Sequence, residues 1–337
     1  RMTFDNSSLF PSLFQQQGIM PALKELEKDY PIFDSEFRHF CATHSIFTVD
    51  DFLLHDIDRL SSSAQRQANL DRLHAGILQV TAIIDEQHQR WRSGIDVLLE
   101  TRKKKDVLSS GMDCVDSLLH GGFREGHLIE LAGPSSSGKT QICLKIAATV
   151  ATNNGVVLYI DTGNSFSATR TKQFVSATLD LSVAEKGITQ QVMNSILCHS
   201  VFDIFSLFSL LHQLEATLGT QTFNADKRVR LLIIDSISSL ITPILSVSSP
   251  QGHALMVSAG FLLKKLADKF DFAVLVTNHM VSGEGSIAKP ALGESWKSLP
   301  HIRILLSHNR GSSTRKLCLL KHPSAPAGNA TTLDNIF

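Results

Sequence analysis

The sequence of 337 residues predicts an α/β protein whose core has a mainly parallel central sheet, preceded by a small all-α N-terminal domain. Residues 20–90 show helical periodicity. From about residue 110, continuous apolar runs alternate with amphipathic segments, which is typical of a parallel sheet covered by helices on both faces. A glycine-rich loop between the first of these apolar runs and the next helix favours the same fold class.

The composition excludes several classes of protein. Lys and Arg number 32, as do Asp and Glu, so the formal charge is zero and a chain-wide basic coat for wrapping nucleic acid is excluded. The five cysteines form no CxxC pair, which argues against a zinc ribbon and a disulfide-rich secreted fold. No apolar run reaches the roughly 18 residues of a membrane span. We therefore expect a soluble intracellular protein with no membrane partner.

The first 90 residues are expected to hold a leader and a helical domain. Residues 1–19 are polar and rich in Gln and Ser, so we expect a disordered leader, with Met2 and Met20 both possible starts. Residues 20–90 are expected to be helical, and one helix face is marked by spacings of 3, 4, 3 and 4 at Leu70, Leu73, Ile77, Val80 and Ile84. This domain is expected to be a folding or docking module, and direct contact with DNA is the alternative.

A basic linker is expected at residues 91–108, ahead of a core at 109–337. Its charge run, residues 102–105, is Arg-Lys-Lys-Lys. A solvated linker face, a nuclear-import signal and a phosphate-contact patch are all compatible with that run.

The core is expected to alternate strands and helices. The expected strands are 127–132, 156–161, 230–237, 272–278, 302–307 and 317–321. The expected helices are 140–152, 202–218 and 255–270. The residues after 321 match no further element, so the sheet is expected to end there.

The loop after the first core strand matches G-x-x-x-x-G-K-[ST], which predicts a phosphate-binding loop. Its expected ligand-binding residues are Gly133, Pro134, Ser135, Ser136, Ser137, Gly138, Lys139, Thr140 and the adjoining Gln141. Glycines let backbone N–H groups turn toward phosphates, and the helix N-terminus adds a positive dipole end. Lys139 should reach the β- and γ-phosphates of ATP, and the Thr140 hydroxyl should ligate Mg²⁺.

A carboxylate partner for the loop is predicted at Asp235, which ends the apolar strand at 230–237. A carboxylate at the tip of a buried strand is costly unless it meets a cation, and Mg²⁺ would supply one. The alternative is that Asp235 caps the following turn through Ser236 and Ser238.

Together with the order of several further motifs, these residues resemble the RecA-like recombinases, specifically the eukaryotic Rad51 family. The motifs lie at 109–111, 116–122, 126, 133–141, 159–162, 231–236 and 277–279. Residues 235–239 leading into Pro243, and 289–293 with Ser295 and Trp296, are most similar to the D-type paralogues. The similarity covers residues 20–325.

The resemblance implies a RecA-like P-loop ATPase core behind an N-terminal helical domain. It also implies ATP and Mg²⁺ as cofactors, a nuclear location, other recombinase paralogues as partners, and a role in assembling recombinase filaments on single-stranded DNA during homologous-recombination repair. One alternative is an active DNA-dependent ATPase that performs strand exchange itself. Another is a different P-loop phosphotransferase or a hexameric helicase.

Two departures from the family pattern bear on ATP turnover. The family's water-orienting Glu is replaced by Gly163, which has no side chain to position water. The family's γ-phosphate-sensing Gln is replaced by His279, which can still hydrogen-bond a phosphate. Asp161 and His279 are the weak candidates for a catalytic role. We therefore expect nucleotide binding with low turnover.

The loops that contact DNA in the family carry few cations here. Residues 246–252 have none, and residues 280–290 have Lys289 alone. Since phosphate contacts supply much of DNA affinity, we expect weak binding to single-stranded or branched DNA. The candidates are Lys289 and Lys297 for backbone contacts and Trp296 for base stacking, with packing under the loop as the alternative for Trp296.

A Phe-x-x-Ala pattern begins at Phe174. In the family this pattern lies in the linker and mediates polymerisation, whereas here it falls in the core, where we expect Phe174 to be buried. The linker lacks the pattern, so self-polymerisation of the family type is not expected.

Overall fold

The computed structural model describes residues 23–28, 30–52, 55–64, 70–87, 93–95, 98, 107–179, 186–220, 228–245, 250–282, 288–308 and 314–334. The chain divides into two compact units, Arg1–Leu99 and Glu100–Phe337, and each is described by itself. The expected leader at 1–19 and the basic run at 102–105 lie outside the described residues.

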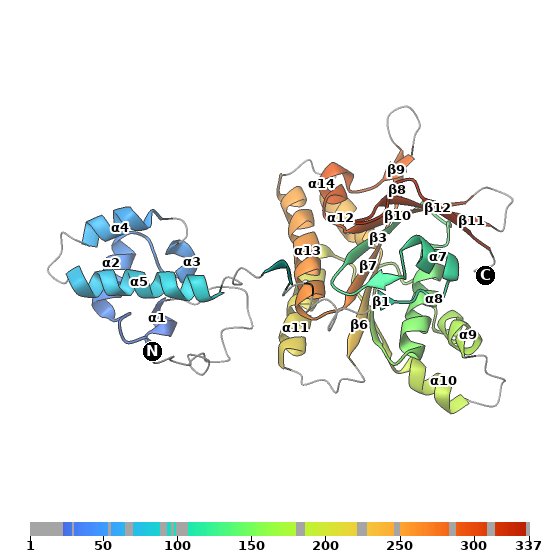
Figure 1. Ribbon diagram of the computed structural model, residues 1–337, viewed down its shortest axis with the longest axis horizontal. Coiled ribbons are helices and arrows are strands. Elements are labelled where there is room, and N and C mark those ends of the chain that lie inside the picture. The colour runs from blue at the N-terminus through green and yellow to red at the C-terminus, as the bar shows by residue number, and fades with distance from the viewer. Residues whose placement is uncertain are drawn as a thin grey trace. The chain divides into compact units, whose positions relative to one another are not determined.

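The N-terminal unit is helical, as predicted (Figure 1). Its helices are α1 (Leu23–Leu26), α2 (Ser35–Thr43), α3 (Val49–Phe52), α4 (Ile57–Ala64) and α5 (Leu70–Gln87). Phenylalanine rings form its core, because Phe37 stacks on Phe33 at 5.3 Å and on Phe52 at 6.4 Å between ring centroids. A Cβ on Gly76 would lie 2.3 Å from the Phe37 ring, so α5 packs directly onto α2. The predicted face of α5 is buried at Leu73, Ile77 and Val80.

The C-terminal unit is built on a sheet whose eight described strands have the order β12-β11-β10-β3-β7-β6-β4-β5. Their bounds are β3 (Leu128–Ala132), β4 (Val156–Asp161), β5 (Ile196–Ser200), β6 (Val229–Asp235), β7 (Ala273–Asn278), β10 (Ile302–His308), β11 (Arg315–Lys321) and β12 (Ala330–Leu333). The six strands from β10 to β5 run parallel, and β11 and β12 continue the sheet antiparallel. Two short ribbons accompany the sheet: β1 (Val107–Leu108) with β2 (Phe123–Arg124), and β8 (Met280–Ser282) with β9 (Ala288–Pro290).

Helices cover both faces of this sheet (Figure 1). One face carries α8 (Lys139–Thr152), α9 (Ala168–Thr178) and α10 (Lys186–Met193), and the other carries α11 (Ile204–Thr220), α12 (Ile237–Leu245) and α13 (Pro250–Lys269). The short helices α7 (Asp113–Leu118) and α14 (Gly293–Lys297) complete the unit. Successive strand residues serve opposite faces, since Ile233 packs with the α8 cluster and Ile234 with the α13 cluster. None of the described helices combines the length and hydrophobicity needed to span a membrane.

The structure corrects the predicted sheet at three places. An edge strand, β5, was not predicted, because only Ile196 of its five residues is buried and the apolar signal is weak. Strand β12 lies beyond the expected last strand and pairs with β11 through the polar sequence Ala-Thr-Thr-Leu. Strand β1 pairs with β2 in a separate two-stranded ribbon, so residues 107–108, expected in the linker, already belong to the C-terminal unit.

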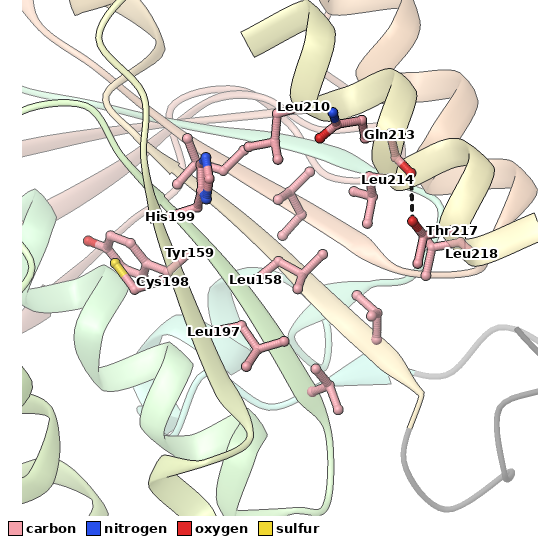
Figure 2. Close-up of a pocket in the computed structure, with 14 residues that line it drawn as sticks. Leu158, Tyr159, Leu197, Cys198, His199, Leu210, Gln213, Leu214, Thr217 and Leu218 are labelled. Atoms are coloured by element: carbon pink, nitrogen blue, oxygen red, sulfur yellow. Dashed lines mark hydrogen bonds between the residues drawn. The ribbon is translucent and has the colours of Figure 1, made fainter. Parts of the chain in front are cut away.

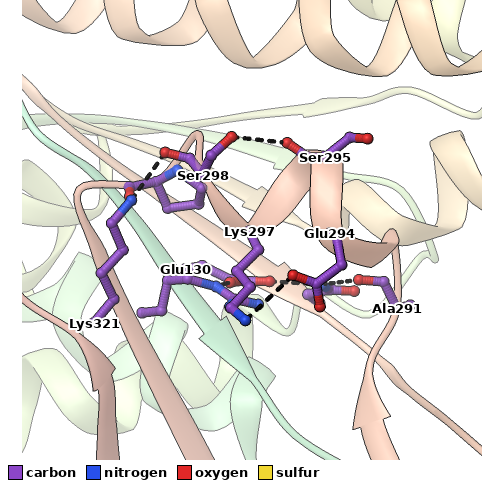
Figure 3. A network of polar contacts seen from close by, with 10 residues as sticks. Glu130, Ala291, Glu294, Ser295, Lys297, Ser298 and Lys321 are labelled. Atoms are coloured by element: carbon purple, nitrogen blue, oxygen red, sulfur yellow. Dashed lines mark hydrogen bonds and ion pairs between the residues drawn. The ribbon is translucent and has the colours of Figure 1, made fainter. Parts of the chain in front are cut away.

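A buried ion pair ties three central strands together. Glu130 of β3 has 0% exposure and pairs with Arg303 of β10, which is also buried. The side-chain nitrogen of Asn278, at the end of β7, donates to Glu130 Oε1 at 2.6 Å and to the Ala291 carbonyl at 2.9 Å. Figure 3 shows Glu130 in this network, beside the turn that carries α14.

We predict that Arg303→Met lowers the free energy of unfolding of the core by about 3–5 kcal/mol, because it leaves the Glu130 carboxylate buried without its counter-ion. Urea unfolding followed by tryptophan fluorescence measures the change. The double variant Glu130→Leu with Arg303→Met removes both charges and should recover most of the loss. Equal stability of the single variant and the wild type would contradict this account of the pair.

Candidate functional site

The predicted phosphate-binding loop lies between the end of β3 and the start of α8. The backbone geometry explains why two of its positions are glycine. Gly138 has φ +106°, a conformation that side chains with a Cβ rarely adopt. A Cβ on Gly133 would lie 2.6 Å from the carbonyl oxygen of Leu306, so the loop passes too close to β10 for any larger residue. Ser136, at the exposed tip, has φ +60°.

The loop brings together hydrogen-bond donors, and no residue of the loop carries a carboxylate to accept from them. The Lys139 ammonium donates to the carbonyl oxygens of Gly133 and Pro134, both at 2.8 Å. Burial lowers the pKa of Lys139, and the nearby Asp235 carboxylate opposes that shift. The Ser137 hydroxyl is buried and has no hydrogen-bond partner among the described residues. A buried donor without a partner, a lysine and a helix N-terminus together fit an anionic phosphate chain.

Two arginines that the loop motif does not contain lie against it. Arg315 of β11 is buried and donates from Nε to the Ser137 carbonyl at 3.1 Å. Arg170 of α9 donates from Nε to the Gln141 side chain at 3.0 Å and covers the Phe174 ring at 4.5 Å. Sequence reasoning missed both, because they lie 29 or more residues from the motif and only the fold brings them to it.

Asp235 lies at the carboxyl end of β6, beside the loop, with 5% exposure. Its Oδ2 accepts a hydrogen bond from the Tyr159 hydroxyl at 3.0 Å, and its Oδ1 accepts one from the Thr277 hydroxyl at 2.5 Å. Burial raises the pKa of Tyr159 well above its usual value, so the phenol keeps its proton and donates it. The carboxylate therefore faces the neighbouring strands rather than Ser236 and Ser238, the partners of the capping alternative.

The oxygen chemistry of Asp235 suits Mg²⁺. Each carboxylate oxygen accepts one protein hydrogen bond and keeps a second lone pair, while Thr140 offers a hydroxyl in the first turn of α8. The described residues contain no cluster of three or more His, Cys, Asp or Glu side chains that could hold a metal ion. A divalent cation here would thus depend on oxygens from a nucleotide as well as on Thr140 and Asp235.

Asp161, one candidate for orienting water, has another task in the structure. Its Oδ1 accepts from the backbone N–H groups of Gly163 and Ser165 at 3.1 Å, and its Oδ2 accepts from Phe166 at 2.8 Å. The carboxylate therefore holds the turn after β4 in place. Gly163 is exposed in that turn, and a Cβ added to it would meet no atom within 4 Å.

His279, the other candidate, lies at the carboxyl end of β7. Its Nε2 is 3.0 Å from the Ser236 hydroxyl, and its backbone N–H donates to the Ser238 hydroxyl at 3.1 Å. Partial burial and then the charge of Lys139 lower the pKa of His279 below its usual value of 6.5. The imidazole is therefore neutral at physiological pH, close to the lysine of the loop.

The three residues predicted to contact DNA differ in their exposure to solvent. Lys289 is exposed on β9, and Lys297 is exposed but paired with Glu294 at 3.2 Å (Figure 3). Trp296 has 0% exposure and packs with Leu292 and Leu299, so the predicted base-stacking role is wrong for this conformation and the packing alternative holds. A tryptophan beside a lysine gives no sequence signal that separates these two roles.

Phe174 is buried in α9 with 8% exposure, as expected for a packing residue rather than a polymerisation motif. The first expected DNA loop is described only from residue 250, where α13 begins, and residues 283–287 of the second lie outside the described residues.

Comparison with known proteins gives a consistent result. The Rad51 family model matches residues 101–332. The chain is 34% identical over 250 residues to the DNA repair protein RAD51 homolog 4 of Bos taurus, covering 72% of this chain and 75% of that protein. It is 35% identical over 251 residues to the protein of the same name from Mus musculus, covering 72% and 74%. A probable RAD51 homolog 4 of Dictyostelium discoideum is 28% identical over 267 residues, covering 68% and 75%. These matches confirm the resemblance to the D-type paralogues.

Proposed function

Since the chain belongs to the Rad51 family, we propose that it is an ATP-binding paralogue that acts in homologous-recombination repair within a complex of related paralogues. In this role it helps recombinase filaments assemble on single-stranded DNA in the nucleus. The observation that carries the proposal is the loop at 133–140, where Ser137 is buried and Lys139 is buried near Asp235.

The residues divide the work of holding ATP–Mg²⁺. Backbone N–H groups of the loop and the Lys139 ammonium would bind the phosphates, and Thr140 and Asp235 would hold Mg²⁺. The bound Mg²⁺ would neutralise phosphate charge. Arg170, held by Gln141 at the start of α8, adds a further cation beside the bound nucleotide.

Slow hydrolysis follows from the same site. Asp161 is committed to the turn after β4, Gly163 carries no side chain, and His279 is held by Ser236. None of these three residues can orient water in the way that a glutamate at position 163 would. We infer that ATP mainly orders the protein for binding its partners, and that strand exchange by this chain itself is the weaker alternative.

A partner surface is available at the β5 edge of the sheet. A groove of about 410 Å³ lies between α11 and strands β4, β5 and β6, and its walls are mainly apolar (Figure 2). Leu197, in β5, is 53% exposed, and Phe202 and Phe205 just beyond it are 62% and 66% exposed. In the described part of the chain, the outer edge of β5 pairs with no strand. Such an edge next to an apolar groove fits an extended segment that adds a strand and inserts a large apolar side chain. We assign this surface to a segment of a related paralogue.

For nucleotide binding, we predict that ATP–Mg²⁺ raises the melting temperature of the wild type but not of Lys139→Ala. A ligand present at 100 times its Kd stabilises the folded state by about 2.7 kcal/mol, whereas loss of the loop cation removes most of the affinity. Differential scanning fluorimetry with and without ATP–Mg²⁺ measures the shifts. Lys145→Ala, on the same helix but outside the loop, is the matched control and should respond like wild type. Equal shifts for Lys139→Ala and wild type would disprove the assignment.

For hydrolysis, we predict that Gly163→Glu raises ATP turnover of the isolated chain, because a Cβ at this position meets no atom within 4 Å and the new carboxylate would supply the water-orienting group that Gly163 lacks. A general base typically contributes about 10²–10⁴-fold in rate. Steady-state phosphate release with single-stranded DNA measures it, and Gly163→Gln is the control of equal size without a base. Robust wild-type hydrolysis that Lys139→Ala abolishes would show that another residue orients water.

For partner binding, we predict that Leu197→Asp and Phe205→Asp each weaken capture of purified related paralogues by at least about tenfold. Both side chains are exposed, so the fold should tolerate the charge while the apolar contact is lost. Pull-downs with measured stoichiometry test this, with Ile188→Asp of α10, 45% exposed, as the control. Unchanged capture by both variants would place the partner surface elsewhere.

A further inference from the structure

A second cavity lies at the opposite end of β3 from the phosphate-binding loop. It has a volume of about 270 Å³, and its polar walls come from His120, Arg124, His127, His322 and Ser324. These residues belong to the turn after α7, to β2, to the residue preceding β3 and to the segment after β11. The five residues of β3 separate it from the loop by about 16 Å, so the cavity is no part of the nucleotide site.

Basic groups converge on this cavity. The rings of His120 and His322 stack with centroids 5.5 Å apart and planes at 30°. Burial lowers the pKa of His322 below 6.5, and the charges of His120 and Arg124 lower it further. From the start of β3, His127 faces the same space and stacks on His301 at 4.7 Å.

No carboxylate lines the described walls of the cavity. The nearest acidic residues in the sequence are engaged elsewhere: Asp116 accepts from Ser109 and from the backbone of Ser110, and Glu125 pairs with Arg228 and Arg230. The Lys321 ammonium, one residue before His322, donates to the carbonyls of Ser298 and Pro300 (Figure 3). Arg124 therefore brings a positive charge to the cavity, and no carboxylate among the described lining residues neutralises it.

The cavity also presents hydrogen-bond donors. The backbone N–H of Ser324 donates to His322 Nδ1 at 3.1 Å, so a neutral His322 carries its proton on Nε2. Arg124 makes no ion pair or side-chain hydrogen bond in the described part of the chain. A guanidinium, an imidazole N–H and a serine hydroxyl in a small cavity match a tetrahedral oxyanion in size and charge.

We propose that this cavity is an oxyanion site that binds a phosphate group, separate from the nucleotide site. Its occupant is either free inorganic phosphate or a phosphodiester of a nucleic-acid backbone, since the two share the chemistry that these donors recognise. A metal ion is disfavoured, because the walls supply cations and no carboxylate.

Histidine NMR of the full chain tests the proposal at the site itself. Inorganic phosphate and sulfate should shift the Cε1–H signals of His120 and His322 saturably. Sulfate remains a dianion between pH 8 and pH 6, so its affinity should rise as the pH falls and imidazolium forms. An anion favours the charged ring, and the apparent pKa of His322 should therefore increase on binding.

The test variant is the double variant Arg124→Gln with His120→Asn, which should weaken sulfate binding by roughly tenfold or more. Asn tolerates the φ of +58° at residue 120, and both side chains are exposed, so the fold should be retained. The control, Lys172→Gln with His212→Asn, removes the same kinds of side chain from exposed positions on α9 and α11 and should bind like wild type.

Oligothymidine in place of phosphate identifies the source of the oxyanion. Shifts of His120 and His322 with oligothymidine, competed by sulfate, assign the site to the nucleic-acid backbone, and shifts with phosphate alone assign it to the free ion. The proposal is overturned if none of the three probes moves these signals, or if the double variant binds sulfate as tightly as its control.

Discussion

The buried carboxylate of Glu130 is the constraint on which the centre of the core depends. A charge inside a sheet is stable only if a counter-ion and hydrogen bonds compensate its lost hydration. Arg303 supplies the charge from β10, and Asn278 supplies a hydrogen bond from the end of β7. Because Asn278 also binds the Ala291 carbonyl, the same carboxylate fixes the turn before α14. The strand that carries Glu130 ends at Ala132, directly before the predicted phosphate-binding loop, so this network holds the strand from which the loop begins.

Beside the loop, a second pair of opposite charges, Lys139 and Asp235, defines the electrostatics of the candidate site. Lys139 and Asp235 are both mostly withdrawn from water, and the Asp235 carboxylate favours the charged form of Lys139. Tyr159 and Thr277 hold both oxygens of Asp235, so the carboxylate has one orientation. By contrast, the groups that could orient water are either absent, at Gly163, or bound to the protein, at Asp161. This contrast is the basis of our proposal that the protein holds a nucleotide rather than consuming it.

The sequence predicted the elements that are marked by a pattern within a single short segment. The central strands β4, β6 and β7 are continuous apolar runs, so they could be predicted, and the G-x-x-x-x-G-K-[ST] motif could be placed between a strand and a helix, as the structure has it. Strands β5 and β12 could not, because edge strands bury few side chains and lack that apolar signature. Arg170 and Arg315 reach the loop only through the fold, and the burial of Trp296 depends on packing against distant residues.

The two edges of the sheet are chemically unequal. Among the described strands, β12 at one edge carries the polar residues Thr331 and Thr332, whereas β5 at the other edge carries the exposed Leu197 and is followed in the sequence by the exposed Phe202 and Phe205. An assembly that extends the sheet would therefore have a fixed polarity and grow from one side. The β5 edge also favours aggregation when it stays uncovered, because an exposed strand edge can pair with strands of other chains. If a related paralogue covers this edge, as we propose, the cellular level of the protein should follow the supply of that paralogue.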